Sequence, residues 1–201
     1  MMISYQQCLQ CDSNNIIANK KIIQLQSYSS TKAYISSFSQ MQGNRELLSI
    51  QKKYLTYYLC KFHPFLLSYQ QLLDLQNQSL SPSFLLVISH CLRKRGDLSG
   101  SYTILQQLLN QGVFSREFLI EYTIVLYQKN LGDTLYSFIH SYSFDQSTTS
   151  EVCYMNGVYS LLQKDFYAAL QHFNLALTKD PCFWEAWIGI GIARSLMVRI
   201  V

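Results

Sequence analysis

The sequence predicts an all-α fold, in which a superhelical solenoid of antiparallel helix pairs follows a divergent helical N-terminal region. Small, aromatic and proline residues stand at fixed offsets in the stretch that begins at residue 150, and two of these offsets recur about one repeat period later. Apolar residues elsewhere follow helical spacing, as in residues 45–60. A recurring register favours repeated helix pairs over an unrelated helical bundle with accidental spacing.

The unit at residues 150–183 carries the clearest form of the pattern. We expect Gly157 and Ala169 to let the two helices of this unit approach closely, because both side chains are small. Phe173 and Ala176 are expected to pack the second helix against the next unit, and a proline then ends that helix. The positions that fit within this unit are Cys153, Gly157, Ala169, Phe173, Ala176 and Pro181.

Neighbouring units continue the register in both directions. Trp187 and Gly191 stand one period after two positions of the clearest unit. Gly96 is expected at the turn between two helices, and Gly132 with Asp133 marks the corresponding turn of the next unit. The expected repeats cover residues 82–115, residues 116–149 in degenerate form, residues 150–183, and residues 184–201 as an incomplete unit.

Upstream of these repeats the pattern weakens. Residues 1–47 are expected to form a divergent polar helical region, with helices at Asn15–Gln26 and Thr31–Met41. Residues 48–81 are expected to form a degenerate helical pair. Pro64 opens a helix there, because the missing N–H of a proline costs nothing in the first turn.

The last expected helix, Trp184 to about Leu196, is apolar on several sides. A solenoid needs a polar capping helix at each end. We therefore expect residues 184–201 to be covered by a following helix of a longer parent protein, to be covered by a neighbouring subunit, or to be covered by nothing.

The register resembles the tetratricopeptide repeat (TPR), a helix–turn–helix unit with a period of about 34 residues. Such repeats bind other chains along a groove that is lined by the first helix of each unit. The candidate groove residues are His90, Arg93, Lys94, Glu117, Tyr127, Gln128, Glu151 and Tyr154. Repeats that grip a terminal carboxylate need Lys and Asn at two groove positions. This chain has Leu86 and Tyr154 at one of them and His90 and Val158 at the other, so we do not expect the chaperone-tail class.

Residues 116–192 resemble the TPR scaffold subunits of the anaphase-promoting complex, the cyclosome. The matching residues are Tyr122, Leu126, Tyr127, Glu151, Cys153, Gly157 and Tyr159, with fainter N-terminal matches at Ser30, Lys32, Ala33, Tyr34, His63, Pro64 and Phe65. The resemblance implies a non-catalytic scaffold of a ubiquitin ligase of the cell cycle and mitosis, in the nucleus and cytoplasm. It also implies binding to other protein subunits and a homodimer formed through the N-terminal repeats.

Two other functions stay open. A generic TPR adaptor in a trafficking, ciliary or RNA-processing assembly would have the same fold and different partners. An enzyme with a repeat appendage would need a catalytic constellation, and residues 1–47 are the segment that the repeat pattern leaves unexplained.

The composition excludes several classes of function. Hydrophobic residues make up 49% and charged residues 14% of the 201 residues, which favours a folded chain. The net charge of +4 is not gathered into long basic runs, so no nucleic acid is expected as a partner. No stretch reaches the roughly 18 apolar residues that a membrane helix needs. We therefore expect a soluble intracellular chain without a membrane partner.

No catalytic residue, cofactor or metal is expected. The four histidines stand apart from one another, and none has a Cys, Asp or Glu at ligand spacing. Cys8 and Cys11 have the spacing of zinc ligands, but no second pair follows them at a useful distance. The even number of cysteines, six, does not imply disulfides, because no secretory signal is visible, and Cys8 and Cys11 are expected to be free thiols.

Overall fold

The structure, a computed structural model, describes residues 56–57, 60–63, 65, 81–143 and 149–199. The helices expected at Asn15–Gln26 and Thr31–Met41, and the helix expected to open at Pro64, lie outside these residues. The described residues form helices and no strand, which confirms the all-α class for that part of the chain. The chain divides into two compact units, Met1–Asp97 and Leu98–Val201.

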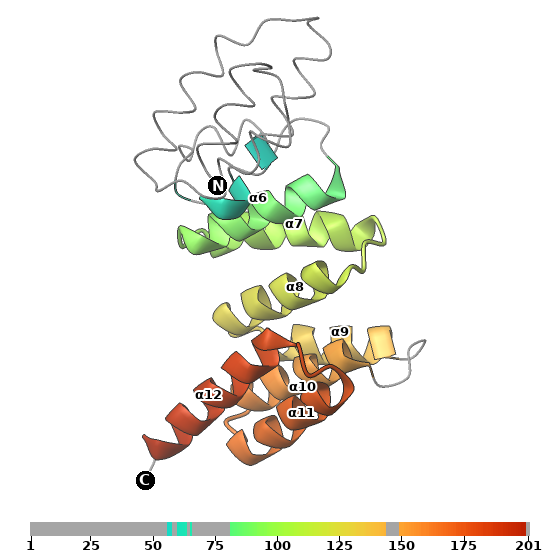
Figure 1. The fold of residues 1–201 in the computed structure, drawn as a ribbon. Helices are drawn as coiled ribbons and strands as arrows, with labels where there is room; N and C mark the ends of the chain where they lie inside the picture. Colours follow the sequence, from blue (N-terminus) through green and yellow to red (C-terminus); the bar gives the residue numbers. More distant parts are fainter. Residues whose placement is uncertain (1–55, 58–59, 64, 66–80, 144–148, 200–201) are drawn as a thin grey trace, which may run out of the picture. The chain divides into compact units, whose positions relative to one another are not determined.

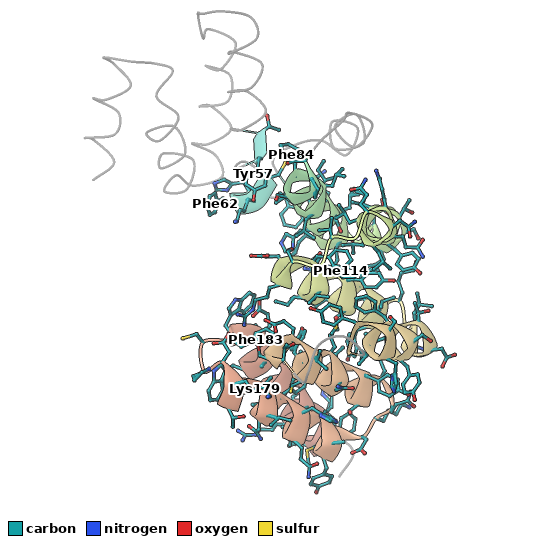
Figure 2. The ribbon with its side chains drawn as sticks, turned by 90° about the vertical axis from the view of Figure 1, so that its right-hand side faces the viewer. Tyr57, Phe62, Phe84, Phe114, Lys179 and Phe183 are labelled. Atoms are coloured by element: carbon teal, nitrogen blue, oxygen red, sulfur yellow. The ribbon has the colours of Figure 1, made fainter. Side chains whose placement is uncertain are left out.

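Helix α6 (Pro82–Lys94) is the long described helix of the first unit. Pro82 begins it, at the start of the first expected repeat, and Phe84 and Cys91 are buried on its inner face. The ring of Tyr57 lies 5.7 Å from that of Phe84 (Figure 2). The Cys91 thiol donates a hydrogen bond to the carbonyl oxygen of Cys60 at 3.3 Å. Both thiols are buried, so they belong to the core of this unit.

The described part of the second unit is a succession of six helices (Figure 1). Each helix from α8 onward packs against α10 or α11, and α7 packs against α8. Helix α12 lies at the end of the succession, against α11 and α10. The helices are α7 (Leu98–Asn110), α8 (Arg116–Gln128), α9 (Gly132–Ser143), α10 (Ser150–Leu162), α11 (Phe166–Lys179) and α12 (Trp184–Val198).

The helices begin at a constant interval. Helices α6, α8, α10 and α12 begin at positions 82, 116, 150 and 184, so the spacing between successive starts is the same each time. Helices α7, α9 and α11 begin at positions 98, 132 and 166, and their starts have this same spacing. The period of the sequence pattern, about 34 residues, therefore recurs in the secondary structure.

The turns repeat with the same interval. Gly96, Asn130 and Lys164 have positive φ angles of 89°, 55° and 60°, and each follows the end of a helix that begins a period. The next residue then donates its backbone N–H to a carbonyl five residues back, at 3.0, 2.9 and 3.0 Å. These three bonds are Asp97 to Leu92, Leu131 to Leu126, and Asp165 to Ser160. A bond of this span is one of the two that define a Schellman motif at a helix end. It pairs a carbonyl that would otherwise have no partner within the helix.

One predicted turn is wrong by two residues. Gly132 and Asp133 are the first residues of α9, and Asn130 takes the left-handed conformation instead. Asparagine tolerates this conformation better than most residues, because its short polar side chain can hydrogen-bond locally. The turn expected at Gly96 is confirmed.

Side-chain caps fix the starts of three helices. The Ser115 and Thr149 hydroxyls accept the backbone N–H of the third residue on, each at 3.3 Å. The Asp165 carboxylate accepts the N–H of Ala168 at 3.0 Å. Such caps satisfy N–H groups that have no partner within the helix, so the sequence specifies where α8, α10 and α11 begin.

The ring of Phe173 fills the space between α10, α11 and α12. A Cβ atom at Gly157 on α10 would lie 2.6 Å from the ring, and one at Gly189 on α12 would lie 2.7 Å from it. Gly157 has the predicted role, whereas the glycine of α12 that meets the ring is Gly189 and not Gly191. A Cβ atom at Gly191 would have no neighbour within 4 Å. Two glycines from different helices thus accommodate one buried aromatic ring.

Replacing Gly189 with alanine should destabilise the chain relative to replacing Gly191 with alanine. Both variants gain about 1 kcal/mol of helix propensity, but only the methyl group at position 189 would overlap the Phe173 ring. Overpacking of a closed core costs about 1–3 kcal/mol. Urea denaturation should therefore give Gly189→Ala an unfolding free energy lower than that of Gly191→Ala by about this amount. Equal values would contradict the packing described for Phe173.

Replacing Lys164 with glycine should stabilise the chain relative to replacing it with alanine. A residue with a side chain pays about 1–2 kcal/mol for the left-handed conformation that Lys164 adopts. The glycine variant should therefore be more stable than the alanine variant. In a helix interior the order of stability is the opposite, because alanine has the higher helix propensity. Thermal unfolding of both variants measures this order, and a more stable alanine variant would contradict the turn geometry.

Candidate functional site

Three candidate groove residues belong to α6 in the first unit. Lys94 is exposed, and His90 and Arg93 are half-buried. The Nη2 atom of Arg93 lies 3.2 Å from the Nδ1 atom of His90. The two side chains therefore hold each other along one side of α6.

The five candidates of the second unit have different degrees of exposure. On α8, Glu117 and Gln128 are exposed and Tyr127 is half-buried. On α10, Glu151 is half-buried, whereas Tyr154 is buried.

Tyr154 is part of the core, which corrects its assignment to the groove. Its ring lies 5.8 Å from that of Phe173 and 5.2 Å from that of Phe183. A tyrosine has an apolar ring and a polar hydroxyl, and it occurs both in cores and at binding surfaces. The residue type therefore could not decide between these two positions.

Arg116, the first residue of α8, forms two ion pairs with described residues of this unit. Its Nε atom lies 3.5 Å from Oε1 of Glu151, and its Nη2 atom donates a hydrogen bond to Oδ2 of Asp180. The guanidinium carbon lies 4.3 Å from the centre of the Phe183 ring. One arginine thus joins α8, the start of α10, and the turn between α11 and α12.

Acidic side chains gather around this arginine, and we call Arg116, Glu117, Glu151, Asp180 and Glu185 the Arg116 cluster. The hydrogen bond from Arg116 holds the pKa of Asp180 below its ordinary value, and the N–H of Cys182, 3.0 Å away, contributes in the same direction. Burial raises the pKa of Glu185, and the neighbouring carboxylates of Asp180 and Glu117 add to the rise. The cluster therefore joins the start of α8 to the start of α10 and to the turn between α11 and α12.

Helix α12 presents a second feature, an exposed apolar strip. We call Trp184, Trp187, Ile188, Gly191, Ile192, Ser195 and Val198 the α12 stripe. Val198 is 77% exposed and Trp184 is 63% exposed. The indole N–H of Trp187 donates to the carbonyl oxygen of Pro181 at 3.2 Å, which orients its ring. Trp187 and Gly191, which the repeat register assigns to helix contacts, are exposed here, because no helix among the described residues covers this side of α12.

The chemistry available to the described residues is limited. They contain no group of three or more His, Cys, Asp or Glu side chains that could hold a metal ion. Cys8 and Cys11 lie outside them. No helix of the described part is long and apolar enough to cross a membrane.

Comparison of the chain with models of known protein families and with curated proteins found no match. Its function therefore has to be inferred from its own residues and their geometry.

Sequence reasoning missed the Arg116 cluster for a physical reason. Arg116 and Asp180 are separated by 64 residues along the chain, and neither belongs to a recognised motif. The repeat interval contains an indirect signal, because Arg116 begins one period and Asp180 lies near the end of the next. An arginine at a first helical position, where the helix dipole favours acidic residues, was the feature to question.

Replacing Arg116 with methionine should lower the melting temperature more at about pH 7 than at about pH 3. An unfolded aspartate has a pKa of about 3.9, and the folded pKa of Asp180 is lower. The stabilisation is therefore complete above the unfolded pKa and is lost as the pH falls through the folded one. Lys94→Met is the control, because Lys94 is an exposed cation on α6 outside the cluster. The prediction fails if Arg116→Met gives the same loss at both pH values.

Proposed function

We propose that this chain is a non-catalytic protein–protein interaction scaffold built of TPR-type helix pairs. The observation that carries the proposal is the constant interval between successive helix starts, together with the left-handed residue that recurs in the turns after α6, α8 and α10. A TPR is a pair of helices with this period, about 34 residues, whereas ankyrin repeats have about 33 and HEAT repeats about 40 to 47.

The packing inside the second unit supports the same proposal. In a solenoid of helix pairs, each repeat contacts its neighbours and needs a small residue where helices approach closely. Gly157 provides this contact within one pair, and Gly189 provides it between that pair and the next helix. Phe173 occupies both contacts, as an aromatic residue on the second helix of a TPR does.

The surface of α8 supplies candidate binding groups. Glu117 and Gln128 are exposed near its two ends, and Tyr127 is half-buried beside Gln128. Aromatic side chains and adaptable polar groups are the usual contents of a protein-binding surface. We assign the groove of the second unit to these three residues.

The partners that we propose are the other protein subunits of the cyclosome. This part of the proposal is supported by the resemblance of residues 116–192 to TPR subunits of that ubiquitin ligase. It carries with it a role in the cell cycle, a location in the nucleus and cytoplasm, and a homodimer formed through the N-terminal repeats.

Affinity purification of the tagged chain from its native cells, followed by mass spectrometry, should recover cyclosome subunits. The double variant Glu117→Ala/Gln128→Ala should recover them several-fold less, because it removes two exposed groups of α8. The matched control Gln171→Ala/Asn174→Ala changes two exposed residues of α11 and should recover them as well as the parent does.

Three outcomes distinguish the parts of the proposal. Recovery of a different assembly, lost in the α8 variant, would keep the scaffold and discard the ubiquitin-ligase role. Equal recovery by both variants would discard the groove residues. A chain that folds and recovers no protein partner would contradict the scaffold itself.

A further inference from the structure

The two sides of α12 are both apolar. With 3.6 residues per turn, the buried residues of α12 share one side of the helix, and the α12 stripe runs along the opposite side. The buried residues are Ala186, Gly189, Ile190 and Ala193. An apolar strip of this length on a surface is typical of an interaction site.

We propose that the α12 stripe is a homotypic interface, on which α12 of a second copy of this chain packs antiparallel, across a two-fold axis at Gly191. This inference goes beyond the scaffold function and does not depend on it. It concerns the last described helix, not the N-terminal repeats.

The spacing of the stripe is symmetric about Gly191. Trp184 and Val198 lie seven residues to either side of it, and Trp187 and Ser195 lie four residues to either side. In an antiparallel two-fold pair, residues at equal distances from the axis face each other. Each large tryptophan therefore meets a smaller residue of the second copy, which is how facing side chains interdigitate.

Gly191 suits the point where the two helices cross. The space where its Cβ atom would lie is open, with no atom within 4 Å. In the pair, Gly191 of one copy meets Gly191 of the other, so neither side chain holds the two backbones apart. Inside the unit, Gly157 and Gly189 likewise make room for a neighbouring group, the ring of Phe173.

The charges that flank the stripe complement each other across the same axis. Glu185 and Arg199 border one edge of the stripe at opposite ends of α12, and Arg194 borders the other edge near its middle. The two-fold axis places each edge of the stripe beside the same edge of the second copy, with the two edges running in opposite directions. Glu185 therefore lies within reach of Arg199 of the second copy at each end of the interface.

The other edge adds a contact of a different kind. Arg194 lies three residues to one side of Gly191, and Trp187 lies four residues to the other side. The antiparallel pair thus brings Arg194 beside Trp187 of the second copy, where a guanidinium over an indole ring is favourable. The hydrogen bond from Trp187 to Pro181 already orients that ring in one copy, which reduces the entropy lost on pairing.

The size of the stripe sets the strength to expect. A stable interface buries about 800 Å² per partner, and one face of a 15-residue helix is smaller than this. We therefore expect a dissociation constant in the micromolar range, of about 1–100 µM.

Sedimentation velocity of the full chain, over a concentration series that brackets this range, tests the proposal. The parent chain should shift from monomer to dimer as the concentration rises. Gly191→Glu places two carboxylates at the axis and should weaken dimerisation by about tenfold or more, which is about 1.4 kcal/mol or more. It should leave the circular dichroism unchanged, because position 191 is open in one copy. Asn174→Glu is the matched control, since it adds the same charge at an exposed position of α11.

A charge reversal that leaves Glu185 in place tests the antiparallel register. Arg199→Glu should weaken dimerisation, because it faces Glu185 of the second copy, and Arg199→Lys, which keeps the positive charge, should not. A parent chain that stays monomeric at about 100 µM overturns the proposal and leaves the stripe to a helix of another protein. A dimer that Gly191→Glu does not weaken overturns the interface, and a dimer that Arg199→Glu and Arg199→Lys affect equally overturns its register.

Discussion

The contact on which the second unit depends is the one between the Phe173 ring and two glycines. Gly157 and Gly189 belong to different helices, and a methyl group at either position would overlap the ring. The ring therefore sets how closely α10 and α12 approach α11. Tyr154 extends this aromatic core to Phe183. The Arg116 cluster closes it on the outside, because Arg116 covers Phe183 and reaches acidic groups from two other segments.

The turns impose a second constraint, and it acts on the backbone alone. The helices α6, α8 and α10, which begin successive periods, are each followed by one residue in the left-handed conformation and by a backbone hydrogen bond to a carbonyl five residues back. Glycine, asparagine and lysine fill this one position in turn. The backbone geometry of the turn is thus the same each time, although the residue type at the left-handed position differs. The period therefore persists in the structure where the sequence pattern is degenerate.

Much of the described fold could be predicted from the sequence, because its causes are local. Pro82 opens α6, Gly96 forms a turn, and the small residue at Gly157 allows two helices to approach, and each of these depends on residues within one period. The contacts that were missed or misassigned depend on orientation or on distant residues. Gly189 and Gly191 are two positions apart, which places them on opposite sides of α12, and the register assigned a role to Gly191 but gave no sign of the contact that Gly189 makes. The pairing of Arg116 with Asp180 links parts of the chain that no local pattern connects.

The placement of the tryptophans has a spectroscopic consequence. The chain contains two of them, Trp184 and Trp187, and both are exposed on α12. Intrinsic tryptophan fluorescence therefore reports on the surroundings of a single helix, whereas far-ultraviolet circular dichroism averages over all of them. Indoles that face water emit at long wavelengths, so any molecule that covers this helix shifts the emission to shorter wavelengths. The two tryptophans of the native chain are thus a fluorescence probe of the exposed side of α12.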